Sequence, residues 1–220
     1  MKVIIFLLFL VLKMKSVSAT DQEGYIIKSI GDTAWGKVDV QMKKVVFGKK
    51  ELDLADMEQE IYFTENNSKT KKIKAGEVIG YGFNYSDVWF HFEVLDWPKN
   101  NWKKNTTAFE RKVNKLTLFI HRAYDGAVPI YKDYYKATGN AMGLPGSKSQ
   151  NTITELYIHT TDLGYVEVTP ASSGANKKLK DFFMKYLNME DAFLNTIDDK
   201  AKFSEAEEIL MAYNEWKKRN

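Results

Sequence analysis

The sequence predicts an α+β fold, in which an antiparallel β-sheet, rolled or partly closed into a barrel, is followed by about three C-terminal α-helices packed on it. Two observations predict this class. Short β-branched and aromatic runs separated by turn residues follow one another from about residue 24 to residue 169. After Pro170 the apolar residues recur instead with the spacing of amphipathic helices. Each helix must bury its apolar face, most simply on the sheet.

The first nineteen residues have the pattern of a signal peptide. Lys2 precedes ten unbroken apolar residues, 3–12, which is too short a run to cross a bilayer, since that takes about 20 residues. Residues 17–19 suit the end of a cleavage site, so we expect cleavage between Ala19 and Thr20. The alternative, a buried amphipathic helix of the mature fold, is disfavoured because the run has no polar face.

The β unit is expected to consist of short strands. The expected strands are residues 25–28, 34–40, 45–47, 61–63, 69–73, 88–95, 116–124, 127–135, 155–160 and 165–169. Residues 88–95 give the clearest pattern, because Val88, Phe90, Phe92 and Val94 alternate with polar or amphipathic residues. Residues 139–149 are expected to form a flexible loop between two hairpins.

Three turn signals predict hairpins in this unit. They are Ile30–Thr33, Asp125-Gly126 and Thr161–Gly164. Asp-Gly is favoured in a type I′ turn, because both central residues need positive φ. Pro129 cannot donate to a β-ladder, so the strand after the second turn should be an edge strand or begin late.

The helical segment is predicted to follow a linker at residues 170–176. Leu179, Phe182, Phe183, Tyr186 and Leu187 form one apolar stripe, and a second short helix is expected around residues 192–197.

A capping box at Ser204 and Glu207 should start the last helix. We therefore expect a signal peptide at 1–19, a β unit at 20–170 and a helical segment at 171–220, with the last two forming one domain.

Composition excludes several classes of protein. The chain has 220 residues, 32 Lys+Arg, 29 Asp+Glu and no Cys. Without Cys there is no disulfide framework, thiol nucleophile, Cys-based zinc site or N-terminal lipid anchor. Residues 1–19 hold Lys2, Lys13 and Lys15 and no acid, so their removal leaves 29 basic and 29 acidic residues. A neutral mature chain does not indicate a nucleic-acid partner.

The sequence contains no catalytic signature. We therefore expect no catalytic, metal or cofactor site. Neither G-x-S-x-G nor H-E-x-x-H occurs. His91, His121 and His159 share no local spacing, and alternation indicates that His91 and His159 face outward. In the loop at residues 139–149, Ser147 separates Gly146 from Lys148, so the Gly-Lys-Ser/Thr of a phosphate-binding loop is missing.

An acidic cluster lies between residues 51 and 60. Its members are Glu51, Asp53, Asp56, Glu58 and Glu60. A glycosidase needs two carboxylates facing each other across a cleft. The favoured interpretation is instead a solvated acidic segment beside Lys49 and Lys50.

The candidate ligand-binding residues are Trp97, Trp102, Lys103 and Lys104. They lie in what is expected to be a polar loop, where exposed indoles would stack on a sugar or a protein partner. The alternative is that both indoles fold back to cover the end of the sheet.

Three N-glycosylation sequons occur, at Asn66, Asn84 and Asn105. They have a meaning only if the host glycosylates exported asparagines. They would then indicate a secreted eukaryotic glycoprotein.

Several short motifs resemble a family of uncharacterised exported proteins of Gram-negative bacteria. They are Gly24-Tyr25-Ile26-Ile27, Gly31-Asp32-Thr33, Gly36-Lys37, Glu77–Phe83, Asp125-Gly126 with Ile130-Tyr131 and Tyr134-Tyr135, and Tyr213–Trp216. The resemblance implies a cell-envelope protein and no particular catalytic residues. The loop at 139–149 and the stretch 97–104 have no counterpart in it.

From these observations we expect an exported, non-enzymatic binding domain for an envelope protein or a glycan. It would be periplasmic or associated with the outer envelope. The alternatives are an envelope hydrolase with a carboxylate-based site on the β unit, and the secreted eukaryotic glycoprotein.

Overall fold

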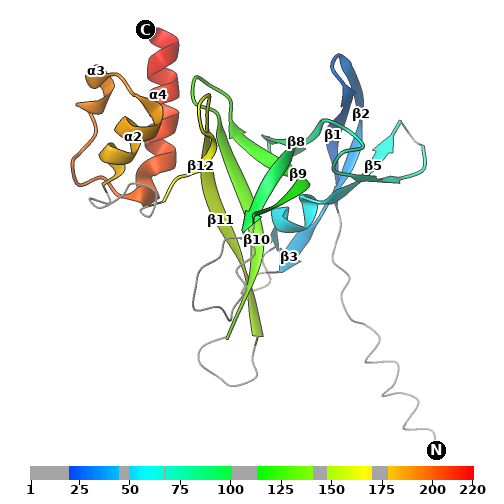
Figure 1. The fold of residues 1–220 in the computed structure, drawn as a ribbon. Coiled ribbons are helices and arrows are strands. Elements are labelled where there is room, and N and C mark those ends of the chain that lie inside the picture. The colour runs from blue at the N-terminus through cyan, green and yellow to red at the C-terminus, as the bar shows by residue number, and fades with distance from the viewer. Residues whose placement is uncertain (1–19, 45–49, 67, 101–112, 141–147, 170–177) are drawn as a thin grey trace, which may run out of the picture.

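The computed structural model describes residues 20–44, 50–66, 68–100, 113–140, 148–169 and 178–220 (Figure 1). The predicted signal peptide at 1–19 and the expected strand at 45–47 lie outside these residues. Within them, no helix is long and apolar enough to cross a membrane.

An antiparallel sheet of ten strands forms most of the described chain. Its order is β12-β11-β10-β9-β8-β7-β1-β2-β5-β6, and it is not closed into a barrel. Its strands are β1 (Thr20–Ser29), β2 (Asp32–Val40), β5 (Glu60–Glu65), β6 (Lys71–Lys74), β7 (Gly80–Tyr85), β8 (Val88–Asn100), β9 (Val113–Tyr124), β10 (Ile130–Asn140), β11 (Lys148–Thr160) and β12 (Gly164–Glu167). The short pair β3 (Met42–Lys44) and β4 (Lys50–Leu52) forms a separate ladder.

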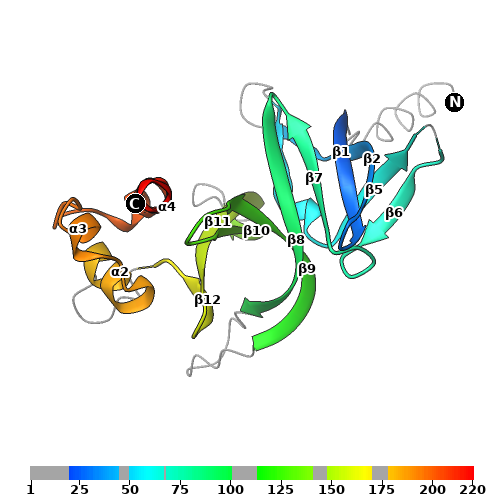
Figure 2. The same ribbon diagram turned by 90° about the horizontal axis from the view of Figure 1, so that it is seen from above.

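The helical elements follow the predicted order. They are η2 (Leu54–Met57) within the β unit, then α2 (Leu179–Leu187), α3 (Asp191–Leu194), η4 (Phe203–Glu205) and α4 (Ala206–Arg219). The α+β class is thereby confirmed, as are the helix at 179–187 and a short second helix. The helices α2, α3 and α4 lie together beside β10–β12, on the convex side of a strongly curved half of the sheet (Figure 2).

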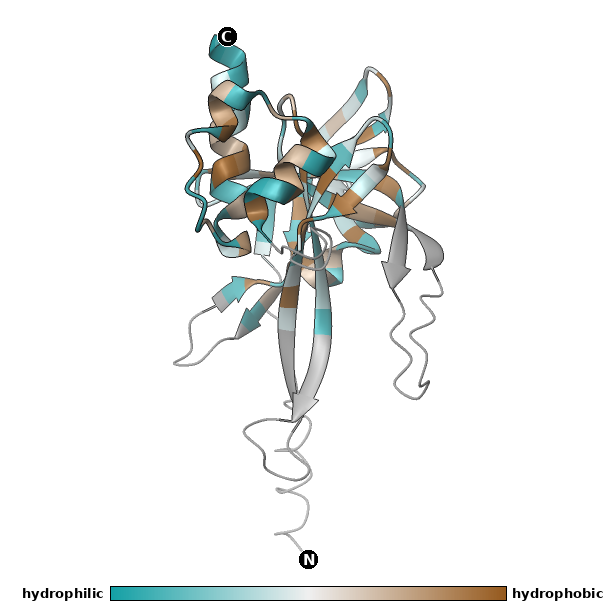
Figure 3. Ribbon diagram, turned by 60° about the vertical axis from the view of Figure 1, so that its left-hand side comes forward, coloured by the Kyte–Doolittle hydropathy of each residue, from teal (hydrophilic) through white to brown (hydrophobic). Residues whose placement is uncertain are grey.

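Two hydrophobic cores form on one face of the sheet, the core face, and a smaller buried cluster of Leu118, Ile120, Tyr131 and Tyr157 lies on the other face. The first joins Val38, Phe83, Phe92 and Phe119 to Met57 of η2. The second packs two strand residues, and Val168 just after β12, against the helices; the buried members include Ile130, Ile158, Val168, Leu179, Phe182, Phe183, Leu210 and Tyr213. Apolar and polar residues alternate around the helices as this packing requires (Figure 3).

The opposite face, the open face, carries the alternate residues of the same strands. Tyr25, Trp35, Trp89 and Glu93 belong to it, as the strand register shows. The clear alternation predicted for residues 88–95 therefore separates Phe92 on the core face from Trp89 on the open face.

The turn after β9 differs from the type I′ turn that Asp125-Gly126 predicts. Tyr124 pairs with Ile130, so residues 125–129 form a longer loop, and Gly126 does not have positive φ. Asn214 of α4 exchanges two hydrogen bonds with the backbone of Val128, at 2.7 and 2.8 Å. A Cβ on Gly126 would lie 2.5 Å from the Asn214 side chain, so the glycine is needed for this close approach. The strand β10 begins after Pro129, as expected.

Three further expectations are corrected. The strands β10 and β11 extend to Asn140 and from Lys148, so both ends of the expected loop at 139–149 are strand, and its residues 141–147 lie outside the described part of the chain. The strand β8 runs to Asn100 and pairs Trp97 with Leu116, so the chain at Trp97 is strand and not loop. The Ser204–Glu207 capping box does not form, because α4 begins at Ala206. Glu207 instead pairs with Lys132, 2.7 Å away.

Candidate binding surface

Four aromatic rings form a platform on the open face, made of Tyr25, Trp35, Trp89 and His91. The ring centroids of Tyr25 lie 5.3 Å from Trp35, 5.9 Å from Trp89 and 6.1 Å from His91. The side chains of Trp35 and Trp89 are 58% and 38% exposed. Large aromatic residues are usually well buried, so two adjacent exposed indoles are the most unusual feature of this surface.

The register of four strands explains why the rings meet. Tyr25 is paired with Trp35 on one side and with Gly82 on the other, and Gly82 is paired with His91. A Cβ on Gly82 would lie 2.7 Å from the Tyr25 ring. Because Gly82 has no side chain, the Tyr25 ring can lie over β7. There it contacts Trp35 of β2 on one side and Trp89 and His91 of β8 on the other.

A hydrogen bond fixes the centre of the platform. The Tyr25 hydroxyl lies 2.6 Å from Nδ1 of His91. Burial and the charge of Arg122 lower the pKa of His91, so the imidazole is neutral at pH 7 and Nδ1 can accept the hydroxyl proton. Burial and Glu93 raise the pKa of Tyr25, which keeps the donor protonated. The platform is thus rigid and uncharged.

Next to the platform, an ion-pair network occupies the open face. The guanidinium of Arg122 pairs with Glu93 and Asp125. The Tyr131 hydroxyl also donates to Glu93, at 3.1 Å. One guanidinium thus pairs with two carboxylates, which leaves this network with a formal charge of −1.

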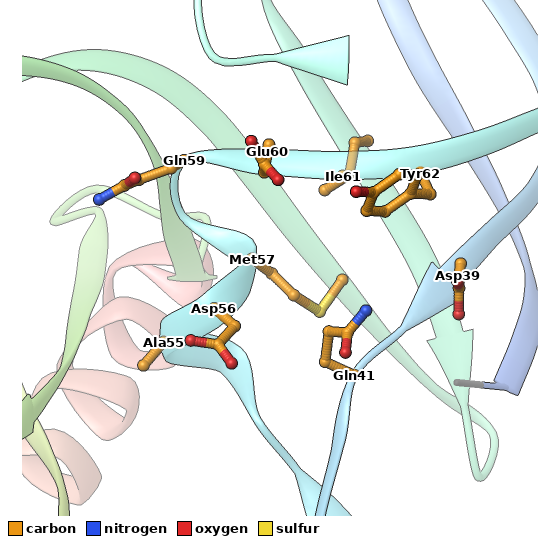
Figure 4. A pocket seen from close by; sticks show the side chains of 9 residues that line it. All are labelled: Asp39, Gln41, Ala55, Asp56, Met57, Gln59, Glu60, Ile61 and Tyr62. Carbon is orange, nitrogen blue, oxygen red and sulfur yellow. The ribbon is translucent and has the colours of Figure 1, made fainter. Parts of the chain in front are cut away.

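A cavity of about 410 Å³ opens where the β2–β5 ladder ends (Figure 4). The last pair is Asp39 with Tyr62; beyond it the chain leaves β2 for β3 and returns through η2. The divergence leaves a space between the two strands. Its lining residues are Asp39, Gln41, Ala55, Asp56, Met57, Gln59, Glu60, Ile61 and Tyr62.

The three carboxylates of the cavity have different surroundings. Glu60 pairs with Lys72 and Asp56 with Lys136, each at 2.6 Å. One oxygen of Asp39 is buried and has no hydrogen-bond partner within the described part of the chain. Burial, and secondarily the charge of Asp21, raise the pKa of Asp39. Oδ1 of Asp39 is thus a hydrogen-bond acceptor without a partner among the described residues.

The interpretation of residues 51–60 as a solvated acidic segment is wrong for two of its members. Glu58 is buried and accepts the backbone N–H of Tyr134 at 2.7 Å. Asp53 is also buried, with Lys136 3.0 Å away. These carboxylates attach η2 to β10, so the acidic cluster is partly structural.

The three histidines do not converge. His91 is exposed on the platform, and His159 is exposed against Tyr165 on β12. His121 is buried on the core face, where Nδ1 lies 2.8 Å from the Tyr134 hydroxyl. Among the residues that the structure describes, no group of three or more His, Asp or Glu residues is placed to hold a metal ion.

The predicted ligand-binding residues cannot be compared with this surface. Trp102, Lys103 and Lys104 lie outside the described residues, and Trp97 is described only as part of strand β8. The predicted cleavage point lies at the edge of the described chain, since β1 begins at Thr20. The platform itself was not predicted.

Comparison of the chain with models of protein families, with curated proteins and with solved structures gives no match.

Proposed function

We propose that this protein is a non-enzymatic binding domain of the bacterial cell envelope that holds a protein or glycan partner on its aromatic platform. The observation that carries the proposal is the pair of exposed indoles, Trp35 and Trp89, fixed around Tyr25. Rigid aromatic side chains supply large contact area at little entropic cost, and are enriched where interfaces gain most of their energy.

Export is part of the same proposal, and it is supported by the signal-peptide pattern of residues 1–19. The resemblance of several short motifs to exported Gram-negative proteins supports the envelope assignment. Fractionation of native cells with mass spectrometry tests this part: we expect the protein in the envelope fraction with Thr20 at its N-terminus. A chain that retains Met1 in the cytoplasm would contradict it.

The binding role is tested with the mature protein as bait in native envelope extract. We expect one stoichiometric partner with the wild-type protein and its loss with the double variant Trp35→Ala/Trp89→Ala. Leu163→Ala is the matched control, because Leu163 is also an exposed apolar residue but lies in the turn before β12. Equal recovery by all three proteins, or no partner for any of them, would reject the platform as a binding site.

An envelope hydrolase is the second candidate, and it is favoured by the cavity. Asp39 has a raised pKa, and Glu60 of the same cavity is ion-paired with Lys72. Carboxylates in such unlike environments are the arrangement that acid–base hydrolysis of glycans uses. This candidate requires that the purified protein release reducing ends from envelope glycans and that Asp39→Asn stop the release. No release by the wild-type protein excludes it.

A further inference from the structure

The platform and the cavity lie on one continuous strip of the open face. We propose, as a refinement of the proposed function, that this strip binds a neutral oligosaccharide that extends along β2 from Trp35 to the cavity at Asp39. Trp35, Lys37 and Asp39 occupy alternate positions of β2, and their register with β1 is unbroken. Their side chains therefore share a face.

The length of the strip suits an extended ligand. Trp35 and Asp39 are four residues apart, so their Cα atoms are separated by about 13 Å along the strand. The cross-strand pair between them, Glu23 and Lys37, is exposed. No described element covers this pair, so a chain-like ligand can contact both ends at once.

The residue types at the two ends match the two surfaces of a sugar ring. The apolar face of a pyranose stacks on exposed aromatic rings; the platform supplies these at one end, and Tyr62, which is 37% exposed, supplies one at the other. Sugar hydroxyls require donors and acceptors. The cavity offers the Asp39 carboxylate and the amides of Gln41 and Gln59, for which the described structure shows no side-chain hydrogen bond.

The same composition argues against a protein as the occupant of the whole strip. The cores of protein interfaces are depleted in charged residues, whereas three carboxylates, Asp39, Asp56 and Glu60, line the cavity. No Lys or Arg belongs to the lining. Two of these carboxylates, Glu60 and Asp56, are paired with Lys72 and Lys136. An anionic polysaccharide would therefore meet like charge at Asp39, so the ligand should be neutral.

The test is calorimetric titration of the mature protein with soluble cello-, chito-, malto- and manno-oligosaccharides, and with oligogalacturonate as the anionic probe. We expect at least one neutral probe to bind and oligogalacturonate to fail. Trp35→Ala and Asp39→Ala should each weaken binding roughly tenfold or more, as expected for loss of a stacking ring or of a hydrogen bond to a charged group. Leu163→Ala should bind like the wild type.

Each result separates the refinement from the proposed function. If no neutral probe binds but an envelope protein is captured in a Trp35-dependent way, the oligosaccharide is wrong and the binding role stands. If neither is bound, both fail. If only Trp35→Ala weakens binding, the ligand does not reach the cavity and the continuous strip is overturned. Unfolding midpoints of the variants verify folding, and Asp39→Ala should retain the wild-type midpoint because the buried oxygen has no partner.

Discussion

His121 shows how a single buried side chain makes the stability of this protein depend on pH. Burial, together with the charges of Lys132 and His91, lowers its pKa to about 3 in the folded protein. In the unfolded chain the pKa returns to about 6.5. Below that pH the unfolded state binds a proton that the folded state does not, so stability falls as the pH falls from about 6.5 toward 3.

We predict that wild-type protein loses about 2 kcal/mol more stability than His121→Asn between pH 7 and pH 5. Urea unfolding at the two pH values gives the free energy of unfolding of each protein. The quantity compared is the change in that free energy between pH 7 and pH 5, not its value at either pH. His159→Asn is the control, because His159 is exposed and its removal should leave the wild-type dependence intact. An identical change in His121→Asn and wild type would contradict the burial argument.

Single residues of the platform illustrate what the sequence could and could not predict. Trp35 is in phase with Lys37 and Asp39, and Trp89 with His91 and Glu93, so alternation alone marks both indoles as outward-facing. Their meeting could not be predicted, because it depends on the pairing of Tyr25 with Gly82 between strands that are distant in sequence. Trp97 and Trp102 are predicted as binding residues because they are close in the sequence, and closeness in sequence does not show which side chains meet across strands.

At the scale of elements, the docking of α4 depends on one buried amide. Asn214 satisfies both the N–H and the C=O of Val128. We predict that Asn214→Ala lowers the free energy of unfolding by roughly 2–4 kcal/mol, because two buried backbone groups lose their partners. Asn220→Ala, at the exposed C-cap of the same helix, should change it by less than about 0.5 kcal/mol.

Gly126 gives an independent measurement of this contact. Gly126→Ala should destabilise the wild-type protein, because the new methyl group meets the Asn214 side chain. In the Asn214→Ala background the same substitution should cost less, because the Oδ1 and Cγ contacts are gone and only Cβ of residue 214, 3.0 Å away, remains. A double-mutant cycle from urea unfolding measures the coupling. Additive effects would show that Gly126 is not required for the approach of the helix.

Elements that depend on turn residues or on hydrophobic periodicity are predicted from the sequence, whereas elements that depend on tertiary contacts are not. The hairpins at residues 30–33 and 161–164 and the helix α2 follow from turn residues and periodicity. The strand β7 is not predicted, because Gly80 and Gly82 weaken its β pattern. Glycine is needed at these positions because a Cβ would clash with the Phe92 backbone at one and the Tyr25 ring at the other. The two-residue turn with positive φ is formed by Ser86 and Asp87. Asp125-Gly126 belongs instead to a longer loop, in which Val128 is hydrogen-bonded to Asn214 of α4.

At the scale of the whole molecule, the two cores share their strands. The strand β9 gives Phe119 to the first core, and β10 gives Tyr134 to the first and Ile130 to the second. We therefore predict one cooperative unfolding transition. Urea curves from far-ultraviolet circular dichroism, which follows the helices, and from tryptophan fluorescence of a Trp216→Phe variant, whose remaining indoles belong to residues 20–170, should have the same midpoint. Loss of the helical signal at lower urea would show that residues 178–220 unfold separately.

The central ladder of the sheet also has a consequence for the order of folding. Most neighbouring strands are joined by short hairpins, but Gly24–Ile27 pairs with Gly80–Phe83, across the whole β2–β6 segment. Closing that large loop is the slow kind of step in β-rich folding, because the entropy of closure is lost before the contact forms. The platform rests on this ladder, so Tyr25 reaches His91 only once the two halves of the sheet have joined. Binding competence should therefore appear with the slowest folding phase.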